Sequence, residues 1–161
     1  MAIYHIVSHT YGTWLTGDER GSIKAPENNL GQPILEHQPR LVTHIKSRMR
    51  QKPIQLNGPM RLTVEETIRE VCGHRQWKLY AQNVRQNHVH IVVGASCEAN
   101  KVWKDLKSYS TRALRRAELI EDGATIWAEG GSGRQIKNVS ALEAVIDYVL
   151  NGQGPDLHEL P

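Results

Sequence analysis

The amino-acid sequence predicts an α+β fold in which one antiparallel sheet carries its helices on one face. Strand-like and helix-like segments alternate along the 161 residues. Two apolar runs in the middle of the chain follow each other with only a tight connection, which is typical of antiparallel neighbours. The later segments repeat their apolar residues at helical spacing. A chain of this length can bury one core, so we expect a single domain over residues 1–161.

The first third of the chain predicts one strand and one helix. Residues 2–9 (AIYHIVSH) have the composition of a strand, and residues 40–50 that of a short basic helix. Between them, residues 11–35 are polar and contain several glycines and prolines. This segment is too long for a plain connection, so we expect a loop insertion there.

A helix and a strand pair are expected next. The helix should span about 64–75, because Thr63 and Glu66 have the spacing of a capping box at its start. The apolar runs at 77–85 and 88–95 then predict two antiparallel strands.

The last third of the chain is expected to be mainly helical. Residues 99–117 form a long amphipathic pattern, with apolar residues on one side and basic residues on the other. A short strand is expected around residues 126–127. A final helix should span about 140–151, with Ser140 and Glu143 as a second capping box.

Composition limits the class of protein. The chain has 39% hydrophobic and 23% charged residues, and it contains no apolar run long enough to cross a membrane. The N-terminus lacks the pattern of a secretory signal. Cys72 and Cys97 form no metal-binding or redox motif, so we expect a cytoplasmic protein with reduced thiols. The net charge of +3 and the eight histidines favour an anionic partner.

Two histidines interrupt the apolar strand at 88–95. Residues two apart on a strand project from the same face, so His88 and His90 should point the same way. Two neutral imidazoles side by side can hold one divalent cation and leave positions open for a substrate. The alternative is a surface strand that happens to contain histidine.

Three other families with such histidines do not fit. Histidine-triad nucleotide hydrolases need a third alternating histidine, where this chain has Val92. Two-histidine phosphoesterases need histidine followed by threonine or serine two residues later, and need it twice. A structural zinc site needs four ligands, which the Cys-Gly-His at 72–74 does not supply.

The His-hydrophobic-His sequence of residues 88–90 resembles the motif of the HUH endonucleases. The opening strand with its histidine, "NVRQNHVHIVV", the basic helix "VWKDLKSYSTRALRR" and the late helix "LEAVIDYVLNGQ" occur in the order seen in the single-tyrosine transposases of small bacterial insertion sequences and their REP-associated relatives. The likeness covers about residues 2–153 without the 11–35 insertion. It implies a ferredoxin-like antiparallel sheet and a metal-dependent transposase or endonuclease acting on single-stranded DNA.

The resemblance also implies a tyrosine that attacks a DNA phosphodiester, giving a 5′-phosphotyrosine and a free 3′-OH that later rejoins strands. We expect this nucleophile to be Tyr148, at the edge of the packed face of the last helix. Tyr109, on the margin of the basic helix, is the alternative.

The resemblance implies Mg²⁺ or Mn²⁺ bound by His88 and His90, with an amide on the tyrosine helix as third ligand. Regular helix geometry favours Asn151 as that ligand. Because Gly152 is expected to end the helix, we choose Gln153, whose longer side chain can then turn toward the histidines.

We expect the DNA to be a foldback hairpin at an element end, and the protein to be a homodimer. Residues expected to contact the phosphate backbone are Arg85, Lys101, Lys104, Arg112 and Arg115. Two alternatives remain open: a non-catalytic or domesticated nucleic-acid-binding protein of the same fold, and a replication-initiator or relaxase-type nickase.

Overall fold

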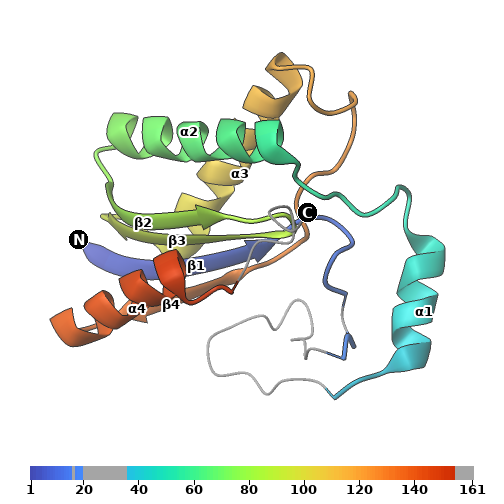
Figure 1. The fold of residues 1–161 in the computed structure, drawn as a ribbon, viewed down its shortest axis with the longest axis horizontal. Coiled ribbons are helices and arrows are strands. Elements are labelled where there is room, and N and C mark those ends of the chain that lie inside the picture. Colours follow the sequence, from blue (N-terminus) through green and yellow to red (C-terminus); the bar gives the residue numbers. More distant parts are fainter. Residues whose placement is uncertain (16, 20–35, 155–161) are drawn as a thin grey trace.

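One antiparallel sheet of four strands, in the order β2-β3-β1-β4, forms the centre of the protein (Figure 1). The strands are β1 (Ala2–His9), β2 (Lys78–Val84), β3 (His88–Ala95) and β4 (Ser132–Ile136). This computed structural model describes residues 1–15, 17–19 and 36–154. Most of the expected 11–35 insertion lies outside the described residues, as does the tail from residue 155.

Strand β3 lies inside the sheet, between β2 and β1. It pairs with β1 from His9 opposite His88 to Ala2 opposite Ala95. It also pairs antiparallel with β2, with one irregularity between Leu79 and Ala81. The predicted neighbouring strand pair is therefore confirmed.

Helices α2 (Gly58–His74) and α3 (Ala99–Arg116) cover one face of the sheet (Figure 1). They pack on each other and enclose the larger core, in which Ile68, Ile91 and Leu106 are fully buried. Burial of branched side chains of this size stabilises the fold by roughly 1.5–3 kcal/mol each.

Helix α4 (Val139–Asn151) packs against β2 and β3 on the opposite face, so the expectation that all helices share one face is wrong (Figure 1). Val149 of α4 and Val92 of β3 are both fully buried in a second, smaller core. The physical reason is that β3 carries apolar residues on both of its faces, and each face needs a cover. The α+β class with one antiparallel sheet is confirmed.

Both predicted capping boxes are wrong. Helix α2 starts before Thr63, at Asn57, whose side chain accepts a hydrogen bond from the backbone N–H of Met60. Helix α4 starts at Asn138, whose side chain accepts from the N–H of Ala141. In each case an asparagine shortly upstream supplies the cap, and asparagine is among the strongest N-cap residues.

The fourth strand lies later in the chain than expected. Ile126 and Trp127 are buried, and Trp127 forms only an isolated bridge to Thr10. These side chains are used to fill the core rather than to extend a ladder. After them, Gly131 adopts φ +133° and comes close to the Val7 carbonyl, which leads the chain into β4.

Helix α1 (Pro39–Arg48) lies to the side of the sheet and has no buried residue (Figure 1). Among the helices in the described part of the chain, none is long and apolar enough to span a membrane. Cys72 and Cys97 are both free thiols. Burial raises the pKa of the Cys72 thiol to about 11, which keeps it protonated and unreactive.

Candidate active site

Four histidines gather on the face of the sheet that α4 covers. His88 and His90 come from β3, and His5 and His9 come from the neighbouring strand β1. The rings of His88 and His90 lie 5.0 Å apart between centroids, at an interplanar angle of 82°. The ring of His90 also stacks on His5, at 5.3 Å and 18°. The predicted common orientation of His88 and His90 therefore places them in a larger cluster.

Tyr148 lies directly beside this cluster. Its ring meets His90 edge-on with centroids 5.9 Å apart, and His5 edge-on at 6.3 Å. Tyr148 remains 48% exposed, so the residue is only partly covered by its neighbours. Tyr148 of α4 and His90 of β3 thus lie in contact within the fold.

The end of α4 brings Gln153 to the same place. The helix ends at Asn151, and the N–H of Gly152 donates to the Tyr148 carbonyl. A Cβ atom on Gly152 would lie 2.8 Å from the Tyr148 ring, so only glycine fits beside the tyrosine without a shift. After this turn, Gln153 Oε1 lies 3.4 Å from His88 Nε2.

Two residues of the β2 strand and its turn hold the end of α4 against the sheet. Asn83 Nδ2 donates to the carbonyl of Val149 at 2.8 Å. The Arg85 guanidinium donates to the carbonyls of Gln153 and Gly154 at 3.5 and 3.1 Å. These bonds fix the segment that carries both Tyr148 and Gln153.

Burial keeps the central histidines uncharged at neutral pH. Desolvation by burial is the main cause that lowers the pKa of His90 to about 3, and the neighbouring histidines and Arg85 contribute to the same shift. Burial, together with the positive charge of Arg134, also lowers the pKa of His5. A neutral imidazole carries a lone pair on one ring nitrogen, as metal ligation requires.

The contact between His88 and Gln153 joins a ring nitrogen to an amide oxygen. His88 Nδ1 lies 2.6 Å from the side-chain oxygen of Asn87, so this nitrogen carries the proton and donates it. In neutral His88 the lone pair is then on Nε2, which faces the oxygen Oε1 of Gln153. Two acceptors this close repel each other unless a proton or a cation lies between them.

The donor set fits a divalent cation with open coordination positions. His88, His90 and Gln153 supply nitrogen and oxygen atoms from two elements, as Mg²⁺ or Mn²⁺ sites with remaining water or phosphate ligands do. Asn151 is engaged elsewhere, because its Nδ2 donates to Asp147 at 2.8 Å on the exposed side of α4. Within residues 1–15, 17–19 and 36–154, no three histidine, cysteine, aspartate or glutamate side chains form a metal-binding group.

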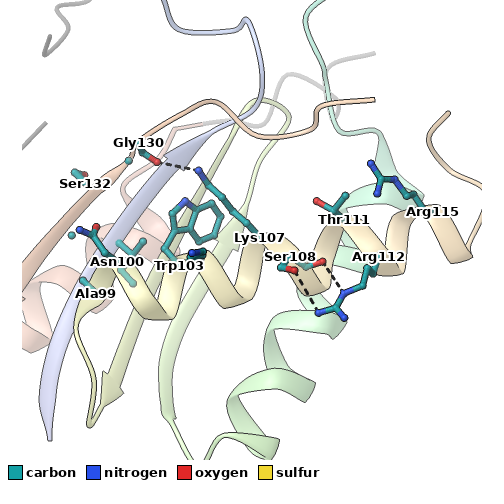
Figure 2. Close-up of a pocket in the computed structure, with 14 residues that line it drawn as sticks. Ala99, Asn100, Trp103, Lys107, Ser108, Thr111, Arg112, Arg115, Gly130 and Ser132 are labelled. Atoms are coloured by element: carbon teal, nitrogen blue, oxygen red, sulfur yellow. Dashed lines mark hydrogen bonds between the residues drawn. The ribbon is translucent and has the colours of Figure 1, made fainter. Parts of the chain in front are cut away.

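The basic side of α3 lines a separate cavity of about 600 Å³ between this helix and the start of β4 (Figure 2). Lys104, Arg112 and Arg115 contribute to its wall, as expected from the sequence for residues on one side of the helix. Ser108, Thr111 and Ser132 add hydroxyl groups. Ile6, which points to the α2 and α3 face, also lines the cavity. The cavity therefore lies on the opposite face of the sheet from the histidines.

Lys107 is a further positively charged residue of this cavity, and it is not among the residues expected from the sequence to contact DNA. Its ammonium group donates to the carbonyls of Ala128 and Gly130 and lies 5.4 Å from the centre of the Trp103 ring (Figure 2). Burial lowers the pKa of Lys107 to about 8, although Glu129 opposes the shift. The only sequence signal was its place in a basic helix.

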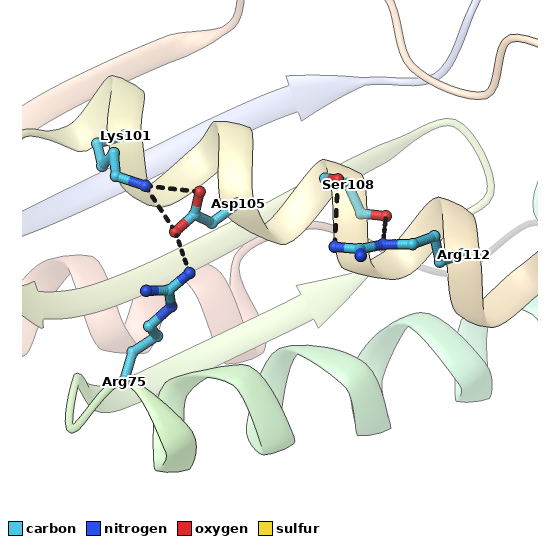
Figure 3. A network of polar contacts seen from close by, with 5 residues as sticks. All are labelled: Arg75, Lys101, Asp105, Ser108 and Arg112. Carbon is cyan, nitrogen blue, oxygen red and sulfur yellow. Dashed lines mark hydrogen bonds and ion pairs between the residues drawn. The ribbon is translucent and has the colours of Figure 1, made fainter.

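The other predicted DNA contacts lie elsewhere. Lys101 forms an ion pair with Asp105, which Arg75 of the α2 end also contacts (Figure 3). Arg85 lies at the end of α4, next to the histidine cluster. Tyr109, the alternative nucleophile, packs against the larger core, with the Arg112 guanidinium 4.3 Å from the centre of its ring. It therefore lies on the other face of the sheet from the histidines.

Four residues of the site were not singled out from the sequence. His5 and His9 could have been found, because both lie in the first strand at positions that point to the face opposite Tyr4 and Ile6. Asn83 and Asn87 gave no signal, since asparagines near a turn are common and their contacts depend on where α4 packs.

Comparisons with known proteins identify a family and a related fold. The family model described as "Transposase IS200 like" matches residues 36–152. A solved REP-associated tyrosine transposase, bound to a REP hairpin, shares the fold with a TM-score of 0.53 at 14% identity. The match covers 92% of this chain and 64% of that one, so this chain spans less than two thirds of its length. A putative transposase from Deinococcus radiodurans R1 has 15% identity and a TM-score of 0.47, over 94% of this chain and 89% of that one.

No curated protein matches the chain. The family model covers well over half of the sequence and includes His88, His90 and Tyr148, the three residues that the fold brings together. The chain belongs to the family of IS200-like transposases.

Proposed function

We propose that this transposase cleaves and rejoins single-stranded DNA through a covalent bond to Tyr148. The observation that carries the proposal is the position of the Tyr148 ring, 5.9 Å from His90 and at the same end of the sheet as His88 and Gln153. A tyrosine, two imidazoles and an amide oxygen thus lie close together. Tyr109 has no such surroundings.

In the proposed cleavage step, the Tyr148 oxygen attacks the phosphorus atom and loses its proton to solvent or to a nearby base. The bond from phosphorus to the 3′-oxygen breaks, and that oxygen takes up a proton, which leaves a 5′-phosphotyrosine and a free 3′-OH. The reverse reaction, with a different 3′-OH, joins strands without an external energy source.

His88, His90 and Gln153 would hold Mg²⁺ or Mn²⁺. When bound, such a cation neutralises charge on the phosphoryl oxygens and orients the phosphate. The chain supplies the rigid part of this arrangement: β3 fixes both histidines, and Asn83 and Arg85 fix the end of α4. Preorganisation of this kind keeps the tyrosine in line with the phosphate.

The α3 cavity offers a place for the rest of the DNA. Lys104, Lys107, Arg112 and Arg115 provide cations with few competing carboxylates, and hydroxyl groups between them can donate to phosphate oxygens. We place the predicted backbone contacts of Lys104, Arg112 and Arg115 here, and that of Arg85 at the reaction centre. Lys101 is the weakest candidate, because Asp105 already neutralises its charge.

A foldback hairpin is the proposed substrate form. The REP-associated relative was solved with a REP hairpin, and a hairpin presents both a duplex stem and an accessible single strand. The single strand can reach Tyr148, while a charged surface across the sheet can bind another part of the same DNA.

We propose a homodimer for the complete reaction, since one tyrosine serves one strand and an element has two ends. Each protomer contributes its own tyrosine beside its own histidines. Light scattering at micromolar concentration, with and without hairpin DNA, measures the state directly. A monomer under both conditions would contradict this part of the proposal.

The proposed chemistry is tested by incubating the protein with end-labelled single-stranded hairpin DNA and Mn²⁺, followed by denaturing electrophoresis. A covalent protein–DNA adduct should form, and excess EDTA should prevent it. DNA binding without any adduct, across a panel of hairpins, would favour the non-catalytic alternative.

A further inference from the structure

His5 and Asn87 each contact the Nδ1 atom of one histidine of the pair. His5 Nε2 lies 3.1 Å from Nδ1 of His90, and Asn87 Oδ1 lies 2.6 Å from Nδ1 of His88. These two contacts come from different strands and different residue types. They engage the same ring nitrogen of both histidines.

These two contacts favour the same tautomer in His88 and His90. A neutral imidazole has one N–H, and the nitrogen that donates it cannot also bind a cation. If Nδ1 of each histidine donates outward, the lone pair of each ring is on Nε2. Asn87 Oδ1 is an acceptor, so it selects this state for His88. His5 Nε2 can act as acceptor for His90 when its own proton is on Nδ1.

The fold makes the His5 contact possible. His5 lies opposite Val92 in the strand pairing, and Val7 lies opposite His90, so His5 reaches His90 diagonally across the β1–β3 pair. His88 lies on the other side of His90 along β3. The two ring nitrogens of His90 face different directions, so binding His5 through Nδ1 turns Nε2 away from His5.

We propose that His5 and Asn87 are positioning residues that hold His90 and His88 in the Nδ1–H tautomer, with both Nε2 atoms available to a divalent cation. This inference rests on the proposed function, because it assigns a purpose to the same site. Partners of this kind commonly change metal affinity by 10- to 100-fold. Neither residue would contact the metal itself.

The first test measures Mn²⁺ affinity by electron paramagnetic resonance titration, without any DNA. His5→Phe keeps a ring of similar size but removes the acceptor, and should weaken Mn²⁺ binding about tenfold or more. His5→Gln restores an acceptor near the position of Nε2 and should stay within about threefold of the wild type, a difference below 1 kcal/mol. His44→Phe, on an exposed turn of α1, controls for weak binding to any histidine.

The contact between Asn87 and His88 is tested in the same way. Asn87→Ala should weaken Mn²⁺ binding about tenfold, whereas Asn87→Asp keeps the acceptor oxygen and should not weaken it. Equal affinity of His5→Phe and the wild type would overturn the assignment of His5. A His5→Gln variant as weak as His5→Phe would do so as well, because the hydrogen bond would then not be the cause.

A second measurement separates this inference from the proposed function. In the metal-free wild type, ¹⁵N NMR of the imidazoles should show protonated Nδ1 and unprotonated Nε2 for both His88 and His90. Protonated Nε2 in either ring would overturn the proposal even if Mn²⁺ binds. If the tautomers are as expected but the wild type binds no Mn²⁺, the proposed metal chemistry fails and the hydrogen-bond assignment stands. The NMR result also decides the matter if His5→Phe does not fold.

Discussion

His88 Nε2 and Gln153 Oε1 lie 3.4 Å apart, although 65 positions separate the two residues in the sequence. The contact exists because α4 packs on the same face of the sheet as the histidines and ends at Asn151, with Gly152 as its C-cap just before Gln153. The other amide of this segment, Asn151, instead contacts Asp147. One turn at a helix end therefore determines which amide can complete a metal site.

Gln153→Ala should weaken Mn²⁺ binding about tenfold, or about 1.4 kcal/mol, because it removes an oxygen ligand. Asn151→Ala is the matched control and should bind Mn²⁺ like the wild type. Isothermal titration of both variants measures the effect. A loss in Asn151→Ala with none in Gln153→Ala would reverse the assignment.

Lys104→Ala should weaken binding of hairpin DNA and lower the slope of log affinity against log salt by about one, as expected for one lost phosphate contact. Lys101→Ala removes an equal charge from the same helix, but from a lysine already paired with Asp105. Its slope should change less. Fluorescence anisotropy at several salt concentrations compares the two. Equal losses in both variants would show that the cavity has no special role.

The affinity for DNA should fall as the pH rises above about 8. Below this value Lys107 is charged and can attract phosphate; above it the ammonium group loses its proton, since burial lowers the pKa of Lys107 to about 8 while Glu129 opposes the shift. Anisotropy titrations at pH 7 and pH 9 measure the change. In Lys107→Met the affinity should be lower at pH 7 and should no longer depend on pH.

Asn138→Ala should destabilise the protein by about 1 kcal/mol, because the Asn138 side chain accepts a hydrogen bond from the first turn of α4. Ser140→Ala, in the residue that the capping-box pattern selects, should have little effect. Urea denaturation monitored by circular dichroism gives both values. A larger loss in Ser140→Ala would place the helix start where the sequence pattern predicts it.

The elements of the fold could be predicted from the sequence because each has a strong local pattern. The strand at β3, its neighbour β2 and the amphipathic α3 were all recognisable from apolar spacing. The starts of α2 and α4 could not be predicted in this way. Asn57 and Asn138 are N-cap candidates in the sequence, but the nearby capping-box patterns with threonine and serine are equally good candidates. The face of the sheet on which α4 packs could not be predicted either. It depends on Val92, whose burial on the second face of β3 is seen only in the tertiary structure.

In the candidate site, too, features set by local geometry could be predicted from the sequence, and features set by tertiary contacts could not. The spacing of His88 and His90 gave their common face, which depends only on strand geometry. The face on which His5 lies also follows from strand alternation, but the contacts of His5 and Asn87 could not be predicted, because they depend on the register between β1 and β3 and on the turn before β3. Lys107 differs from its basic neighbours by its burial, which requires the tertiary structure.

Peptide mapping of the covalent adduct locates the nucleophile, which we propose to be Tyr148. Wild-type protein is incubated with a hairpin oligonucleotide and Mn²⁺, digested with protease and nuclease, and analysed by tandem mass spectrometry. We expect a nucleotide bonded to Tyr148. We also expect that Tyr148→Phe forms no adduct yet binds DNA within about threefold of the wild type, less than 1 kcal/mol, while Tyr109→Phe still forms the adduct. A nucleotide on Tyr109, or an adduct that persists in Tyr148→Phe, would rule out Tyr148 as the nucleophile.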